Sequence, residues 1–275
     1  MALSINTNIA SMNATRKLGV STHNLGKTFE RLSSGLRVNG AKDDTAGLAI
    51  ATRMTAQIRG MNMAIRNAND AVSMVQIAEG ALDETTNALQ RMRELAVQAA
   101  NGSLTTSDRL SLELEVKQLR SEVQRISTTT KFNGKSLISD GRGDTTTFQV
   151  GANTTESLVV TVGSAGASAI GVNSTQVTVI NTTVAATALT NLDLALDSVS
   201  DIRANLGAYQ NRFESLMANL SNVVENTSAA RSRIMDADIA KETANLTRSA
   251  IMQQASTAIL AQANQQPQIA LQLLG

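Results

Sequence analysis

The chain has 275 residues, 42% of them hydrophobic, and a net charge at pH 7 of only +1. With so little net charge, four Phe, one Tyr and no Trp, it lacks the basic surface and the aromatic platform that nucleic acids bind, so no nucleic-acid partner is expected. Cysteine is absent and His23 is the single histidine, which excludes disulfides, thiolate metal sites and His-rich metal sites. We therefore expect a structural protein without a cofactor, and not an enzyme.

The N-terminal segment is amphipathic but has no partner close to it in the sequence. Its first fifteen residues carry no charge and mix polar with apolar side chains, which does not fit a cleavable signal peptide. Apolar residues recur at helical spacing, but the stripe slips register in its middle. Its members are Ile5, Ile9, Met12, Leu25, Phe29, Leu32 and Leu36.

Nearly unbroken three-and-four spacing of apolar residues from Met54 to Ala96 predicts one very long helix. Asp43, Asp44 and Thr45 offer a cap at its start, and Asn101-Gly102 offers a stop. Gly60 and Gly80 lie inside it, where close approach of a neighbouring helix would explain them, as would tolerated drift of the sequence.

A second helical stripe runs from Leu112 to Ile126, after the capping residues Thr105 to Asp108, and we expect it to end near Asn133-Gly134. Because the turn between the two helices is short, they are expected to lie antiparallel.

Residues 140–187 differ in composition, since Thr, Ser, Val and Gly dominate there. Segments 145–151, 157–163 and 175–183 alternate in the way of short strands, which favours a small β-hairpin element over a flexible linker. Helical spacing returns at Leu189 and continues to Ala230. The simplest packing buries the three helical stripes against one another.

The C-terminal segment is a second amphipathic stripe, and nothing after Arg248 is charged. Gln and Asn side chains interrupt its apolar residues, so we expect no membrane insertion. Its apolar members are Ile234, Ile239, Leu246, Ile251, Ile259 and Ala263. Each terminal stripe must therefore pack on the other or on another molecule. The expected fold is mainly α, with long antiparallel coiled-coil-like helices, a small β-hairpin element and paired terminal helices.

Three stretches of the sequence resemble bacterial flagellin. They are SSGLRVNGAKDDTAGLAIATRM at 33–54, LQRMRELAVQAANG at 89–102, and DADIAKETANLTRSAIMQQASTAILAQANQQPQ from Asp236. The resemblance implies an inner coiled-coil domain built from residues 1–44 and 235–275, and a helical-bundle domain at 45–234 with its β-element at about 140–187. The large outer domains of longer flagellins look absent.

The resemblance also implies a function and partners. The chain would polymerise with copies of itself into the flagellar filament for swimming motility, after secretion to the cell exterior, and would meet an export chaperone, cap proteins and junction proteins. The expected polymer contacts are Ile5, Ile9, Leu25, Phe29, Leu32, Ile239, Leu246, Ile251 and Ile259. Gln262 and Gln266 are candidates to line the central channel, with simple solvation of these helix positions as the alternative.

A patch of four residues matches, position by position, the residues by which the vertebrate Toll-like flagellin receptor recognises many flagellins. They are Arg91, Leu95, Gln98 and Glu115. Two other functions are compatible with the pattern. A hook-filament junction or cap protein would share the terminal-helix plan, and a soluble coiled-coil binding module would form a discrete oligomer with ordered ends.

Overall fold

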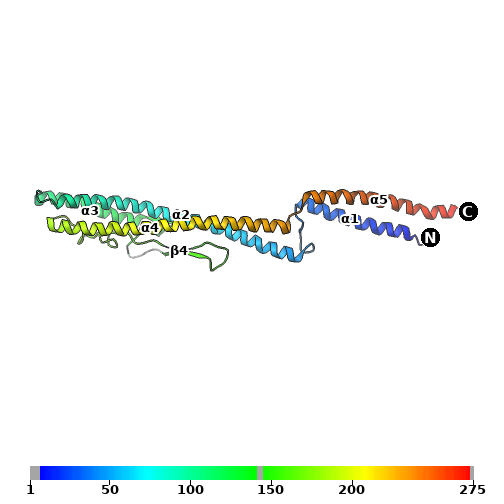
Figure 1. Ribbon diagram of the computed structural model, residues 1–275, viewed down its shortest axis with the longest axis horizontal. Coiled ribbons are helices and arrows are strands. Elements are labelled where there is room, and N and C mark those ends of the chain that lie inside the picture. Colours follow the sequence, from blue (N-terminus) through cyan, green and yellow to red (C-terminus); the bar gives the residue numbers. More distant parts are fainter. Residues whose placement is uncertain (1–6, 141–144, 273–275) are drawn as a thin grey trace. The chain divides into compact units, whose positions relative to one another are not determined.

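The computed structural model describes residues 7–140 and 145–272, which are mainly α-helical (Figure 1). The helices are α1 (Ile9–Ser34), α2 (Thr45–Ala99), α3 (Thr106–Thr129), α4 (Thr182–Met235) and α5 (Ile239–Gln272). The strands are β1 (Lys131–Phe132), β2 (Lys135–Ser136), β3 (Thr145–Gln149) and β4 (Ser157–Thr161). The chain divides into two compact units: unit 1 comprises residues 1–56 and 225–275, and unit 2 comprises residues 57–224.

Unit 2 is a bundle in which α2, α3 and α4 run alongside one another (Figure 1). Its core is aliphatic, as the near absence of aromatic residues predicts, and Phe213 is the one large ring buried in it. Exposed ion pairs connect the helices: Arg91 of α2 pairs with Glu115 of α3, while Arg93 of α2 pairs with Asp193 of α4. The prediction of three helices burying their stripes against one another is confirmed.

The turn between α2 and α3 is held by side chains at both of its ends. Thr105 and Asp108 form a reciprocal capping box, in which the Thr105 N–H donates to Asp108 Oδ2 at 2.9 Å and the Asp108 N–H donates to Thr105 Oγ1 at 3.3 Å. Arg109, which is buried, donates to the carbonyls of Ala99 and Asn101 at 2.9 and 2.8 Å. These bonds satisfy the carbonyl of Ala99, which the last turn of α2 leaves without a helical partner, and the carbonyl of Asn101 in the turn that follows.

A small hairpin, β1–β2, follows α3 and was not predicted. Asn133 and Gly134 form its turn with φ values of +49° and +81°, the left-handed conformations that Asn-Gly favours in tight hairpins. The expected end of the helix near this dipeptide is therefore too late, because α3 already ends at Thr129.

The second hairpin confirms two of the three predicted strands, because β3 and β4 pair antiparallel from Thr145↔Thr161 to Gln149↔Ser157. It packs on the bundle through an edge-to-face contact of Phe148 with Phe213, whose ring centroids lie 6.1 Å apart. Its turn lies against α2: a Cβ added to Gly60 would sit 3.0 Å from Ala152 Cβ. The close approach at Gly60 is therefore made by the hairpin and not by a helix, and no such approach exists at Gly80.

The third predicted strand, 175–183, is wrong, because the segment forms turns and then the start of α4. The Asn173 side chain accepts from the N–H groups of Thr175 and Gln176, which bends the chain out of an extended conformation. Val177 and Val179 are each buried, but Arg120 and Glu113 of α3 bond their backbone where a strand partner would. The alternation of Val residues thus reflects burial under α3 and not a sheet.

Unit 1 contains the antiparallel pair of α1 and α5, so the prediction of paired terminal helices is confirmed (Figure 1). Asn8 Nδ2 donates to the carbonyl of Ala263 at 2.8 Å, and the ion pair between Arg31 and Glu242 at 3.7 Å joins the other ends of the two helices. α1 ends at Gly35, whose φ of +68° is a left-handed helix cap. The connectors after α1 and before α5 pair by a backbone bond from Ala237 to Gly35.

Candidate interaction surfaces

The line of contact between α1 and α5, here called the α1–α5 seam, combines half-buried leucines with small and polar side chains. On α1 most of the less exposed residues follow three-and-four spacing, and Lys27 and Arg31 are half-buried beside them; the spaced residues are Ser11, Ala14, Leu18, Ser21, Leu25, Thr28 and Leu32. On α5, among the side chains described up to residue 266, the buried residues are Glu242, Ser256 and Ala263. Such a seam buries little apolar area, so it contributes only weakly to the stability of the pair.

Other large apolar side chains of the same two helices face away from the seam. Among the described residues expected to make polymer contacts, five are between 49% and 66% exposed: Ile9, Phe29, Ile239, Ile251 and Ile259. Leu25, Leu32 and Leu246 are half-buried, and Ile5 lies outside the described residues. The structure adds three exposed residues that the sequence analysis did not name as contacts: Met12, Val20 and Met252.

The seam also explains the register slip in the sequence. The expected stripe followed the largest apolar residues, whereas the seam of α1 follows Ser11, Ala14 and Ser21, which a search for hydrophobic residues passes over. The three-and-four spacing of small residues on α1 is the signal that marks the seam. It also implies that Ile9, Met12 and Val20 point outward.

The two glutamines expected in the channel, Gln262 and Gln266, are both exposed on α5. None of the helices in the described part of the chain combines the length and the apolar content needed to cross a membrane. Within residues 7–140 and 145–272, no three His, Asp or Glu side chains gather where a metal ion could be held.

Three of the four residues in the predicted receptor patch lie on the surface of unit 2. Arg91 is exposed, and its guanidinium bonds Glu94 at 2.8 Å and Glu115 at 2.9 Å, which raises the pKa of Arg91. Gln98 is also exposed. Leu95 does not fit a contact role, because it is only 2% exposed and packs in the bundle core. The position carries the family motif, but the side chain points inward.

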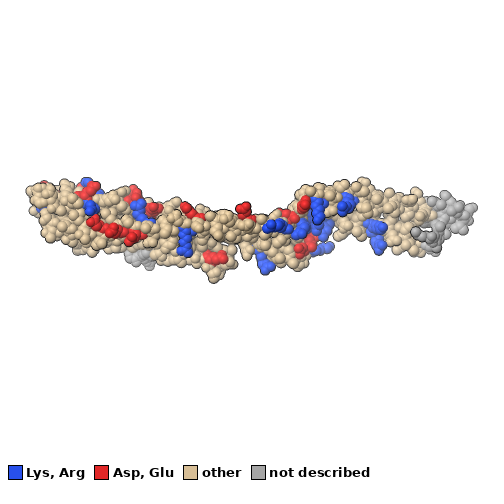
Figure 2. Space-filling model, viewed as in Figure 1, with Lys and Arg blue, Asp and Glu red and all other residues tan. Residues whose placement is uncertain are grey.

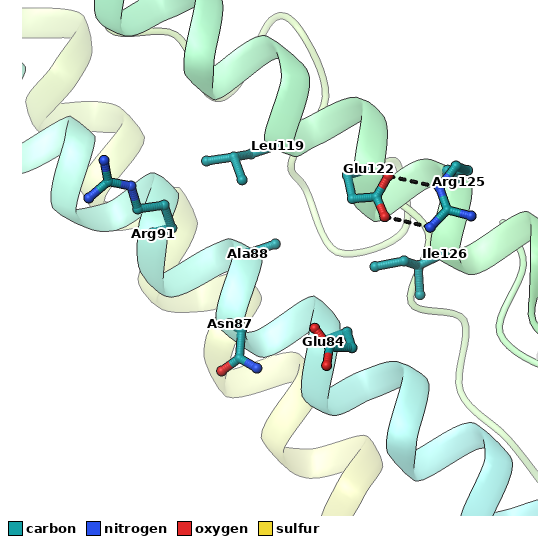
Figure 3. A pocket seen from close by; sticks show the side chains of 8 residues that line it. All are labelled: Glu84, Asn87, Ala88, Arg91, Leu119, Glu122, Arg125 and Ile126. Atoms are coloured by element: carbon teal, nitrogen blue, oxygen red, sulfur yellow. Dashed lines mark hydrogen bonds and ion pairs between the residues drawn. The ribbon is translucent and has the colours of Figure 1, made fainter.

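Beside Arg91 lies a groove of about 490 Å³ between α2 and α3 (Figure 3). Ala88 of α2 and Leu119 and Ile126 of α3 point into the space between the helices, as Figure 3 shows. Arg125 pairs with Glu122 along α3 at 2.5 Å, and this bond lowers the pKa of Glu122. The groove thus has an apolar floor with charged edges, an arrangement suited to a protein surface.

Comparisons with known proteins match both ends of the chain. The family model described as the bacterial flagellin N-terminal helical region matches residues 5–142, and that of the C-terminal helical region matches residues 189–274. A flagellin of Halalkalibacterium halodurans is 48% identical over 270 residues, which cover 98% of this chain and 99% of that relative. A flagellin of Bacillus subtilis is 45% identical, with the same coverage. The alignment with polar flagellin A of Vibrio parahaemolyticus, at 37% identity, spans 377 positions, so this chain is a short form.

Solved structures agree with the fold. The crystal structure of Bacillus cereus flagellin matches with a TM-score of 0.50 and 30% identity, over 60% of this chain and 94% of that one. A chain described as a flagellar hook-associated protein of Vibrio parahaemolyticus matches with a TM-score of 0.60 over 70% of this chain, at 15% identity. The second match is a likeness of fold alone, so fold by itself does not separate filament subunits from hook-associated proteins.

Proposed function

Because this chain belongs to the bacterial flagellin family, and is thus a structural subunit of the flagellar filament and not an enzyme, we propose that α1 and α5 make the principal contacts between subunits. The observation that carries this proposal is the outward position of their large apolar side chains, such as Phe29, Ile251 and Ile259. Exposed apolar residues gathered on two helices are typical of an interaction surface.

The small stabilisation that the α1–α5 seam provides in the free subunit supports the same proposal. Fully burying one Ile or Phe side chain contributes about 1.5–3 kcal/mol, whereas the seam only half-buries its leucines and otherwise holds small or polar residues, so it gains less in the free subunit. The terminal helices therefore reach their full stability only when neighbouring copies cover them. A subunit that remains loosely folded at its ends suits export through a narrow channel and gains order on incorporation.

Seeded polymerisation tests this proposal. Purified monomer is added to short filament fragments, the product is examined by electron microscopy, and the monomer left in solution gives the critical concentration. Ile251→Ser should raise the critical concentration by about tenfold or more, because an apolar contact worth more than about 1.4 kcal/mol is lost. Val159→Ser, at an exposed position of β4 in unit 2, is the matched control and should have a much smaller effect.

The same experiment separates the alternatives. A hook-filament junction or cap protein would add to filament ends and stop, while a soluble coiled-coil module would form discrete particles with protease-resistant ends. Long helical tubes favour the filament subunit, and equal effects of Ile251→Ser and Val159→Ser would count against the terminal contacts.

We further propose that residues 1–44 and 235–275 form the inner domain of the filament, residues 45–234 form the surrounding bundle domain, and Gln262 and Gln266 face the central channel. Their exposure and the lack of charge after Arg248 support this role. Replacing both glutamines with Lys should slow filament elongation without raising the critical concentration of seeded assembly. Unchanged elongation would contradict the channel-lining role of the two glutamines.

An export chaperone and the cap and junction proteins are the expected transient partners.

We also propose that the monomer is recognised by the vertebrate Toll-like flagellin receptor through Arg91, Gln98 and Glu115, with Leu95 holding the helix surface from below. Arg91→Ala should reduce receptor activation in a reporter-cell assay, whereas Arg93→Ala should not. Both arginines are exposed on α2 and ion-paired, so the comparison isolates the patch. Equal activity of the two variants would argue against this site.

A further inference from the structure

A polar cavity of about 280 Å³ lies between α1 and α5, inside unit 1. Lys27 and Arg31 of α1 line it together with Glu242 and Arg248 of α5, and Asn24 and Asn245 add side-chain amides. Nearly every group in its wall is charged or a hydrogen-bond donor, whereas the rest of the seam also contains half-buried leucines.

The positive charges of this cavity are only partly neutralised. Lys27 Nζ lies 3.0 Å from Asp43 Oδ1, and Arg31 lies 3.7 Å from the buried carboxylate of Glu242. Among the residues that the structure describes, Arg248 has no ion pair or hydrogen-bond partner for its guanidinium, and the buried Nε of Arg31 has no acceptor. One positive charge and one buried donor therefore remain for an anion.

The net charges of the two units indicate that the anion is a carboxylate of another copy of the chain. Unit 1 holds 11 Lys and Arg against 7 Asp and Glu, a net charge of +4, while unit 2 holds 13 against 16, a net charge of −3. On the face seen in Figure 2, Lys and Arg gather where α1 ends and α5 begins. Copies that pack closely through such units repel one another unless their cations meet carboxylates.

We propose that this cavity is a carboxylate socket, in which Arg248 and Arg31 receive an Asp or Glu side chain of a second copy during assembly. The inference rests on the proposed filament contacts of α1 and α5. A carboxylate accepts two N–H bonds from a guanidinium fork, and the amides of Asn24 and Asn245 complete its polar surroundings. Once covered by the neighbour, the pair is desolvated, so an empty socket would carry an uncompensated charge.

Critical concentrations of three variants test the socket. Arg248→Gln should raise the critical concentration of seeded assembly by about tenfold, since a charge-assisted bond in a covered site is lost. Arg248→Lys keeps the charge without the fork and should fall between wild type and Arg248→Gln. Arg16→Gln is the matched control, because it removes the same charge from an exposed position of α1 outside the cavity, and it should change the value less than twofold. The circular dichroism of all three monomers should equal that of wild type.

Cross-linking identifies the partner group. The chain has no cysteine, so Arg248→Cys provides a single attachment point for a short photoreactive label. Illuminated filaments should yield dimers cross-linked next to an Asp or Glu, and neutralising that residue should reproduce the Arg248→Gln effect. Equal effects of Arg248→Gln and Arg16→Gln, or inorganic phosphate bound in the socket within wild-type filaments, would overturn the proposal. If wild-type monomer formed no filaments on seeds, the proposed subunit contacts would fail first.

Discussion

Asp108 shows how a single carboxylate makes the bundle sensitive to acid. Its bonds from the hydroxyl and the N–H of Thr105 lower its pKa below the ordinary value of about 3.9. The stabilising contribution is therefore complete above that ordinary value and is lost as the pH falls through the lower, folded pKa. We expect Asp108→Asn to lower the denaturation midpoint at pH 7 but not at pH 2, as followed by circular dichroism. An equal loss at both pH values would show that the carboxylate charge is irrelevant.

Leu95 shows that a family motif does not determine whether a side chain is exposed or buried. The motif gave the position, but only the helix orientation determines whether the side chain reaches solvent, and here it is buried. We expect Leu95→Ala to lower the free energy of unfolding by about 2–5 kcal/mol, measured by urea denaturation, because it leaves a cavity in the core. Gln98→Ala, on the exposed side of the same helix, serves as the control and should change stability little.

At the scale of the element, the long helices can be predicted from the spacing of apolar residues and from their caps. The turns depend on backbone conformation and side-chain hydrogen bonds, which that spacing does not indicate. α2 begins where Asp44 caps it, as expected, because its side chain accepts from the N–H of Gly47 at 2.8 Å. Asn133-Gly134 is a dipeptide that fits both a helix stop and a hairpin turn, and in the structure it forms the turn of the β1–β2 hairpin. The predicted strand at 175–183 is wrong because burial by a helix and burial by a sheet both produce alternating Val, and local sequence does not distinguish them.

The two glycines inside α2 give a matched pair of predictions. Gly80→Ala should raise the free energy of unfolding by about 0.5–1 kcal/mol, because the helix gains propensity and an added Cβ meets nothing within 4 Å. Gly60→Ala gains the same propensity but presses on Ala152, so its benefit should be smaller, and Gly60→Leu should be destabilising. Thermal denaturation followed by circular dichroism measures all three. Equal stabilisation by both alanines would mean that the hairpin turn yields freely.

For the whole molecule, the two units differ in what they bury. Unit 2 holds a continuous aliphatic core, whereas the described part of unit 1 buries few large side chains. We expect amides of α1 and α5 to exchange with solvent faster than those of α2 and α4 in the free monomer, and to become protected in the filament. Hydrogen-exchange mass spectrometry of both forms checks this. Equal protection of both units in the monomer would contradict a weak α1–α5 seam.

Arg109 has a consequence for how the bundle opens. Its guanidinium ties the last carbonyl of α2 and a carbonyl of the following turn to the first turn of α3, so neither helix end can fray without breaking these bonds. An exposed turn of this kind would ordinarily be the first place to loosen. Here the two ends should open together as one cooperative step, which makes this turn a poor entry point for proteases despite its position between two long helices.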